Sequence, residues 1–245
     1  MSDDLFVDAA TATCSVVAAR FERLGVVVVT GFCEDATAAA AAGELDAVVA
    51  SDPERPVTFA AQGYPEVRDT AVRSWGLGEV RDRIPVALSV LRDERLHEWA
   101  AAICGPDHVR QPGSIASTFP GCGQAWHQDS RDPHPRHFTL NRIFFPAAVS
   151  PEQGRLVLVP GSHLEGDIPA AEPYGHLDGE VAVAPAAGTV VLMHSRCFHQ
   201  VERNRSTRPR TQVNGRVMPA ECPPDVTARP RFSTGPWNFR TGRPE

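Results

Sequence analysis

The chain has 245 residues, of which 42% are hydrophobic and 22% are charged, and its formal net charge is −6. This length fits one large domain, and the composition is that of an ordinary globular protein with enough apolar material for a core. The acidic balance, with no stripe of lysine and arginine, argues against nucleic acid or an anionic membrane as the partner.

The six cysteines are scattered without a Cys-x-x-Cys pair, which favours neither a disulfide framework nor a cysteine-based zinc site. The N-terminus shows no basic region followed by an apolar stretch, and the longest apolar run, at 26–29, is too short to cross a bilayer. We therefore expect a cytoplasmic enzyme with no membrane partner. The sequence carries no indication of oligomeric state.

The first part of the chain, to about residue 110, predicts helices and one early strand. Apolar side chains recur at helical spacing before Gly25, which is typical of a helix stop, and Asp35 is a candidate cap for an alanine-rich helix. A run of four valines predicts a buried strand. The expected elements are helices at 12–24, 36–50 and 85–104, a strand at 26–29 and an irregular loop at 51–78, rich in proline and glycine.

After Pro112 the pattern changes to short β-type runs separated by turn residues. Several short strands after a helical start predict an α+β protein built on a β-sandwich or jelly roll. The tail from 219 to 245 is rich in proline and arginine, and we expect it to be disordered or to fold back as an active-site flap carrying Trp237 and Phe239. The expected strands are 114–119, 125–129, 138–146, 155–159, 180–184, 188–193, 196–201 and 208–217.

The run Trp126-His127-Gln128-Asp129-Ser130 carries the clearest chemical signal. Side chains alternate between the two faces of a strand, so His127 and Asp129, two residues apart, are expected on the same face. An imidazole and a carboxylate then converge beside the sheet. A third ligand from another strand would complete two histidines and one carboxylate on one side of a metal ion, which leaves the opposite side open.

His199, in a second β-type run, is the candidate third ligand. Alternate residues of the last predicted strand share one face, and several of them are polar. An arginine at that place is suited to hold a carboxylate through two parallel hydrogen bonds. The residues on this face are Arg208, Arg210, Gln212 and Asn214.

From the residues alone, other interpretations stay open. A single His-x-Asp pattern is common, and two histidines with an aspartate also bind Zn(II) or Mn(II). A redox-inert jelly-roll metal-binding protein and an interaction module with an accidental triad are therefore alternatives. His163, in an expected turn, and His194 are interpreted as structural. Three further histidines compete as ligands: His134, His137 and His176.

The order of motifs in the second half of the chain resembles the phytanoyl-CoA dioxygenase family of Fe(II)/2-oxoglutarate oxygenases. The resemblance covers roughly residues 15–218 and includes the opening helix and strand at 21–29. The family's motifs appear here as Trp-His-Gln-Asp at 126–129, Gly-x-Leu from Gly154, Pro-Gly-Ser-His at 160–163, a strand from Gly188, and a distal His199 followed by Asn204, Ser206 and Arg210.

The resemblance implies a double-stranded β-helix, a cupin-like jelly roll with the N-terminal helices packed on one sheet. It further implies a single oxygenase domain at 1–218, with a helical part at about 12–110 and the jelly-roll core at about 112–218. By resemblance, iron is bound by His127, Asp129 and His199, the far carboxylate of 2-oxoglutarate pairs with Arg210, and Asn141 also touches the cosubstrate.

The implied activity is a dioxygenase reaction that uses O2 and 2-oxoglutarate, hydroxylates an unactivated C–H bond of a small molecule, and releases succinate and CO2. Desaturation, epoxidation and ring rearrangement are alternative outcomes, and a secondary-metabolite intermediate is the expected substrate. Because halogenating relatives lack the carboxylate ligand, Asp129 favours oxygenation. One departure from the family is Val201, which stands where a serine often helps to hold the cosubstrate.

Overall fold

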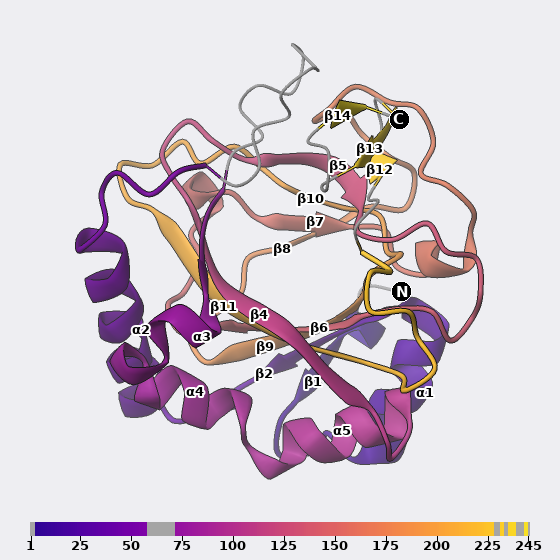
Figure 1. Cartoon of the computed structure of the whole chain (residues 1–245), viewed down its shortest axis with the longest axis horizontal. Coiled ribbons are helices and arrows are strands. Elements are labelled where there is room, and N and C mark those ends of the chain that lie inside the picture. Colours follow the sequence, from indigo (N-terminus) through magenta and orange to yellow (C-terminus); the bar gives the residue numbers. More distant parts are fainter. Residues whose placement is uncertain (1–2, 58–71, 228–230, 233–234, 239–242, 245) are drawn as a thin grey trace.

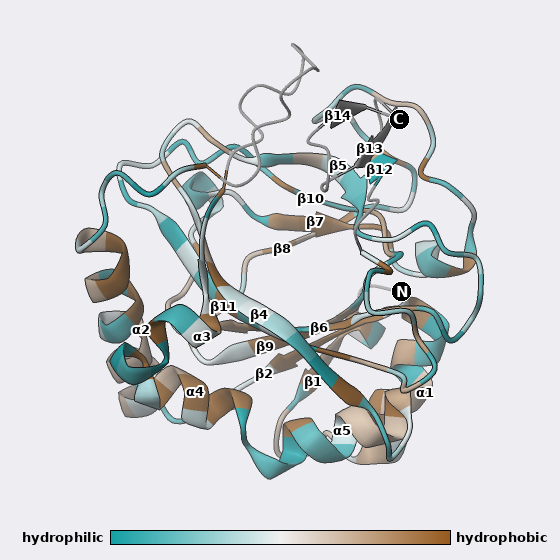
Figure 2. Ribbon diagram, in the orientation of Figure 1, coloured by the Kyte–Doolittle hydropathy of each residue, from teal (hydrophilic) through white to brown (hydrophobic). Residues whose placement is uncertain are grey.

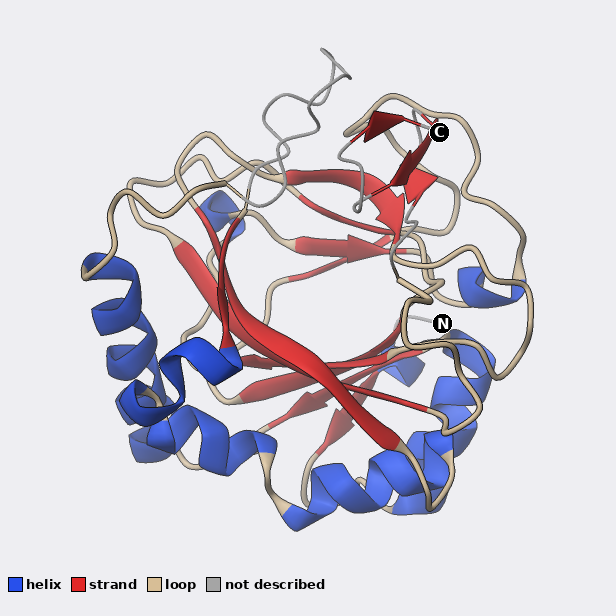
Figure 3. Cartoon of the chain, viewed as in Figure 1, coloured by secondary structure: helices blue, strands red, loops and turns tan. Residues whose placement is uncertain are grey.

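The computed structural model describes residues 3–57, 72–227, 231–232, 235–238 and 243–244. Two β-sheets face each other, and helices cover the outer side of one of them (Figures 1 and 3). This arrangement confirms the predicted α+β fold with a cupin-like jelly roll and with N-terminal helices packed on one sheet.

The first sheet is the helix-covered one, and the second sheet lies opposite it. In spatial order the first sheet contains β1 (Phe6–Asp8), β2 (Val26–Thr30), β9 (Thr189–His194), β6 (Leu140–Phe145), β11 (Arg210–Met218), β4 (Val109–Thr118) and β3 (Arg73–Gly76). The second sheet contains β14 (Arg243–Pro244), β13 (Gly235–Asn238), β12 (Arg231–Phe232), β5 (Gln124–Gln128), β10 (His199–Val201), β7 (Leu156–Leu158) and β8 (Val181–Val183).

The helices lie almost entirely in the first half of the chain. They are α1 (Cys14–Leu24), α2 (Asp35–Ala50), α3 (Leu77–Val80), α4 (Pro85–Leu91) and α5 (Glu94–Cys104), with short 3-10 turns at Asp3–Leu5, Arg81–Arg83, Pro151–Gln153 and Ser162–Leu164. None of the helices in the described ranges is long and apolar enough to cross a membrane.

The ends of α1 follow from its sequence. The Thr13 side chain accepts a hydrogen bond from the Val16 backbone N–H and so caps the first turn. The helix ends at Gly25, which adopts the left-handed conformation with φ of 67° and donates its backbone N–H to Phe21. A side chain at Gly25 would also collide with His163 and Cys197. Glycine is therefore required here, and the chain turns directly into β2.

Three predictions for the helical part were wrong in detail. The residue that caps α2 is Glu34, without a side-chain hydrogen bond, and Asp35 is the first helical residue. The helix expected at 85–104 is interrupted, because the Asp93 carboxylate accepts from the backbone N–H of Arg95 and starts a new helix there. The loop expected at 51–78 ends early, in β3 and α3, and its residues 58–71 lie outside the described residues.

The valines of β2 show how the first sheet is packed on both sides. Val27 and Val29 face the helices, whereas Val26 and Val28 face the second sheet, and all four are almost completely buried. This strand is apolar along its length in Figure 2. A strand buried on both faces reads as a continuous apolar run rather than an alternating one. The first sheet is therefore the central layer of the molecule.

All eight strands predicted for the second half are present, with shifted ends. The strand expected at 196–201 is limited to β10, so His194 and His199 end and begin different strands, separated by a turn. The last strand begins at Arg210, so Arg208 lies outside it and is exposed. The described part of the tail adds β12, β13 and β14 to the edge of the second sheet, and β12 pairs with β5. The Trp237 side chain and Phe239 lie outside the described residues.

Candidate metal centre

Two histidines come together because the strands that carry them pair directly. In the antiparallel ladder between β5 and β10, His127 lies opposite His199, and their ring centroids are 4.0 Å apart. Residues opposite each other in such a ladder project from the same face. Asp129 follows the last residue of β5 and lies on the same side as His127. The strand pattern thus brings the three predicted ligands to one point between the sheets.

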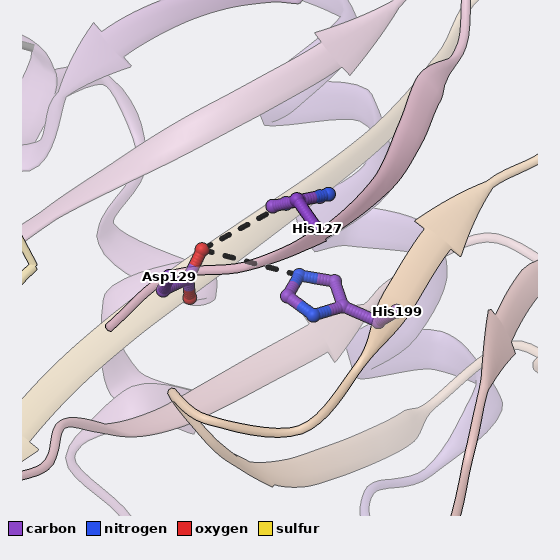
Figure 4. Close-up of side chains that lie close together, drawn as sticks. All are labelled: His127, Asp129 and His199. Atoms are coloured by element: carbon purple, nitrogen blue, oxygen red, sulfur yellow. Dashed lines mark ion pairs between the residues drawn. The ribbon is translucent and has the colours of Figure 1, made fainter. Parts of the chain in front are cut away.

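The ligand atoms are close enough to share one ion. Asp129 Oδ1 lies 3.8 Å from His127 Nε2 and 3.9 Å from His199 Nε2 (Figure 4). All three ligand atoms lie within 4.8 Å of one another. Metal–ligand distances of about 2.0–2.2 Å allow separations of this size. Among the described residues no other group of three such side chains meets the same criterion.

Both imidazoles are held in the tautomer that a metal requires. His127 Nδ1 lies 2.7 Å from the carbonyl oxygen of Ala125, and His199 Nδ1 lies 2.9 Å from that of Cys197. A carbonyl only accepts, so each Nδ1 carries the proton and donates it. Each Nε2 therefore keeps its lone pair and faces Asp129. Such bonds from the remote nitrogen orient histidine ligands in metal sites.

The ionisation states also suit a metal. Burial lowers the pKa of His127 to about 3, and the charge of the adjacent His199 adds to the shift. Burial by itself raises the pKa of Asp129, but the neighbouring imidazoles, that of His199 first, bring it below its ordinary value. Near neutral pH, His127 is thus neutral and Asp129 is an anion. Deprotonated ligands of both kinds are what a divalent cation binds.

A chain of amide side chains fixes the aspartate. The backbone N–H of Arg142 donates to Asn214 Oδ1, Asn214 Nδ2 donates to Asn141 Oδ1, and Asn141 Nδ2 donates to Asp129 Oδ2 at 3.0 Å. A backbone N–H at one end and a carboxylate at the other set both amide orientations. Oδ2 is thereby engaged and Oδ1 faces the histidines. The structure places the Asn141 amide on Asp129, and Asn141 also lines the cavity, so its predicted contact with the cosubstrate stays a prediction.

Within the described ranges, Arg210 is a buried cation without a counter-ion. Its side chain is 3% exposed, its Nε and Nη2 atoms have no hydrogen-bond partner, and its guanidinium lies 5.1 Å from the Phe145 ring centroid. Burial lowers the pKa of Arg210 to about 10. Burying an unpaired charge is costly, so the Arg210 side chain is suited to bind an anionic ligand.

The three ligand side chains line a cavity of about 410 Å³ between the sheets. This is within the usual size range of small-molecule sites. Gln212 lines it, with an unpaired and buried Oε1, and so does Val201. Arg210 lies two residues before Gln212, at the start of β11, and lines a second cavity of about 670 Å³. Of the residues of β11 that line the cavity of the three ligands, Gln212 is the one nearest to Arg210 in sequence.

One functional candidate was missed from the sequence. Arg216 lines the cavity of the three ligands, on the strand face that also carries Gln212 and Asn214. The period-two rule that selected Arg210 extends to Arg216, and the predicted strand reached residue 217, so the signal was present. Arg208, expected on the same strand face as Arg210, instead precedes β11 and is exposed.

Four of the other histidines contact protein groups away from this cluster, and His163 and His194 are the two that were interpreted as structural. His163 Nε2 lies 3.1 Å from the Glu22 carbonyl oxygen, which joins the turn at Ser162–Leu164 to α1. His194 stacks on Phe138 with 4.3 Å between ring centroids. Two more pair with nearby carboxylates, His137 with Asp132 and His176 with Glu180.

Fold and site together define a jelly-roll protein with a candidate metal centre of two histidines and one carboxylate. The sequence profile described as Phytanoyl-CoA dioxygenase (PhyH) matches residues 21–212. This match covers most of the chain, and the chain belongs to the phytanoyl-CoA dioxygenase family, as the order of motifs predicted. A search of the curated proteins finds no significant match.

Solved structures with the same fold include enzymes of antibiotic biosynthesis. The epimerase SnoN, in complex with Fe3+, alpha ketoglutarate and nogalamycin RO, gives a TM-score of 0.65 at 19% identity over 89% of this chain and 85% of that one. The carbocyclase SnoK from nogalamycin biosynthesis gives 0.64 at 20% identity over 94% and 89%. AviO1 from Streptomyces viridochromogenes Tue57 gives 0.67 at 22% over 87% and 99%.

Proposed function

We propose that the protein is an Fe(II)- and 2-oxoglutarate-dependent dioxygenase that hydroxylates an unactivated C–H bond of a small molecule and releases succinate and CO2. The observation that carries the proposal is a pair of buried histidines beside the half-buried Asp129 carboxylate, on the same side of the first sheet as Arg210, whose Nε and Nη2 have no partner among the described residues. Membership of the phytanoyl-CoA dioxygenase family supports it.

The three side chains suit an iron site in particular. His127, Asp129 and His199 would occupy one side of the ion, and the cavity would leave its other side accessible to ligands. A closed structural zinc site has four protein ligands, and the described residues bring only three together here. Bound iron with 2-oxoglutarate and O2 would supply the oxidising power that no amino-acid side chain has.

Arg210 fits the far carboxylate of 2-oxoglutarate. Its Nε and Nη2 atoms form one edge of the guanidinium, and both are buried and unpaired. That edge matches a carboxylate, which accepts two parallel hydrogen bonds. Val201 offers no hydroxyl for this carboxylate, and the Gln212 amide is the polar group we assign to that contact instead. The chain itself thus supplies charge, hydrogen-bond donors and a cavity between the sheets.

The relatives indicate which outcomes to test beside hydroxylation. SnoN is an epimerase and SnoK a carbocyclase, so the fold supports more than one reaction. An intermediate of secondary metabolism, small enough for a cavity of about 410 Å³, is the substrate class we propose. Desaturation, epoxidation and rearrangement would use the same ligands and differ in how the substrate lies.

The test is an anaerobic titration of the metal-free protein with Fe(II) and then with 2-oxoglutarate. We expect the visible charge-transfer band of a metal-bound 2-oxo acid in the wild type and its loss in His199→Ala. His176→Ala is the matched control, because His176 lies on the surface and its ion pair among the described residues is with Glu180. Iron binding without a band would indicate a metal centre of another kind, including a redox-inert one.

A further inference from the structure

Arg216 is a second cation that faces the metal centre, six residues beyond Arg210 on β11. In the ladder between β11 and β6 it lies opposite Asn141, the residue that holds Asp129. It lines the cavity of about 410 Å³ together with the three ligands. At about 3.3 Å per residue, the two arginines are separated by about 20 Å along the strand. They therefore face different parts of the space between the sheets.

The Arg216 guanidinium has no partner among the described residues. Its Nε atom is buried without a hydrogen bond, and no ion pair to it is found within the described ranges. The acid nearest to it in the cavity lining is Asp129, whose pKa its charge helps to lower. The remaining polar residues of that lining, such as Ser114 and Asn214, are neutral. Among the described residues of the lining, the charge of Arg216 is thus balanced only by the Asp129 carboxylate, which would also bind the metal ion.

A charge balance shows what this implies for the loaded enzyme. With iron and cosubstrate bound, the two positive charges of Fe(II) and that of Arg210 would be cancelled by Asp129 and the doubly negative 2-oxoglutarate. Arg216 would then remain as one uncompensated positive charge in a partly water-excluded cavity. Such a charge attracts an anion more strongly than it would in bulk water.

We infer that Arg216 binds a carboxylate group of the substrate and so directs the substrate's other end toward the metal. This inference rests on the proposed function, because it assigns the cation that is left after iron and cosubstrate are placed. A single guanidinium with an unpaired Nε forms two parallel hydrogen bonds with one carboxylate. A phosphate dianion would need a second cation, and the described lining contains no lysine and no other arginine.

Arg216 is better placed for the substrate than for the cosubstrate. Arg210 is 3% exposed and both of its unpaired nitrogens are enclosed by protein, which suits a ligand held inside. Arg216 is only partly buried, and it shares the cavity with Thr227 and Ser74, which come from the segments next to the undescribed ranges. Two arginines on one strand face then serve two different carboxylates.

The inference can be tested without knowing the substrate. The wild-type protein is loaded anaerobically with Fe(II) and 2-oxoglutarate, and is titrated with 3-phenylpropanoate and octanoate and with their neutral amides. Binding is measured by calorimetry and by the perturbation of the charge-transfer band. We expect each acid to bind about tenfold more tightly than its amide, because a charge-assisted pair replaces a neutral contact.

The variants separate this role from a structural one. In Arg216→Gln the acids should lose their advantage over the amides, whereas Arg216→Lys should retain part of it. Arg205→Gln, at an exposed site, is the control and should keep the full advantage. Equal binding of acids and amides by the wild type, including no binding of either, would overturn the inference, and so would an advantage that survives in Arg216→Gln. Failure of the proposed function is distinct, because the band with 2-oxoglutarate would then be absent from the start.

Discussion

The two sheets of the jelly roll differ in strand length, in packing and in the residues that they contribute to the candidate site. The longest strands belong to the first sheet, with ten residues in β4 and nine in β11, whereas β5 and β10 in the second sheet have five and three. The first sheet is packed on both sides, by helices and by the second sheet. The candidate metal ligands lie on these two short strands or, for Asp129, directly after one of them, and the two inward arginines lie on the long β11.

This difference indicates that the stability of the fold depends mainly on the first sheet and the chemistry of the metal centre mainly on the second. The ligand cluster places two imidazoles and a carboxylate in a buried position, which costs stability unless a metal or hydrogen bonds compensate. The first sheet, with its two apolar layers, supplies the stability that such a cluster requires. Changes in the second sheet should therefore affect chemistry first, and changes in the first sheet should affect folding first.

The largest effect is expected when a ligand of the second sheet is removed. His127→Ala, Asp129→Ala and His199→Ala should each reduce 2-oxoglutarate turnover to background, because the metal loses one of three protein ligands. The free energy of unfolding should change by only about 1 kcal/mol, since no large apolar side chain is lost. Succinate formation and urea denaturation measure the two quantities. Full turnover in any one variant would remove that residue from the ligand set.

The opposite result is expected for the core of the first sheet. Phe144 is fully buried between the sheet and the helices, and it lies opposite Val213 and Val190 on the neighbouring strands. Phe144→Ala should lower the free energy of unfolding by about 3–5 kcal/mol through lost burial and a cavity. Iron binding per folded molecule should be retained. A variant that folds normally but loses iron would show that the two sheets are not separable in this way.

Arg210 lies on β11 of the first sheet, but its proposed role is to bind 2-oxoglutarate rather than to stabilise the fold. Arg210→Ala should raise the KM for 2-oxoglutarate by about 10- to 100-fold, because a charge-assisted bidentate pair is lost. The metal-free protein should become no less stable, since an unpaired buried charge is removed with the side chain. Arg208→Ala, at an exposed position before β11, is the matched control. An unchanged KM in Arg210→Ala would remove Arg210 as the anchor for 2-oxoglutarate.

The sequence predicted those features that depend on local rules. His127 and Asp129 share a side because they are two residues apart, and Gly25 ends α1 because it alone tolerates the left-handed turn. The partnership of His127 with His199 depends on the pairing of β5 with β10, more than seventy residues apart. The β-type run around His199 made it only a candidate for the third ligand, and the family resemblance then implied that role. Local rules set faces and ends, whereas pairing comes from the whole chain.

The missed features have the same cause. The edge strands β1 and β3 are short and are stabilised by neighbours distant in sequence. The hydrogen-bond chain through Asn214 and Asn141 requires that β11 and β6 lie side by side, which no local pattern specifies. Arg216 was accessible to the period-two rule, but its importance depends on the absence of a partner within the described fold. Such an absence becomes visible only when the neighbours of a side chain are known.

The smallest expected effect concerns Val201, the residue that departs from the family pattern. Val201 is 3% exposed and lines the cavity between the two sheets, where the family often has a serine. Val201→Ser should lower the KM for 2-oxoglutarate by about two- to tenfold, because a neutral hydrogen bond to the cosubstrate is gained. Val157→Ser, on the adjacent β7 and equally buried, is a control that should give no such gain. A raised KM in Val201→Ser would mean that an apolar wall is required there, and that the Gln212 amide alone replaces the missing hydroxyl. Gln212 and Arg210 of the first sheet would then hold the cosubstrate, whereas the second sheet would provide the metal ligands and an apolar wall at Val201.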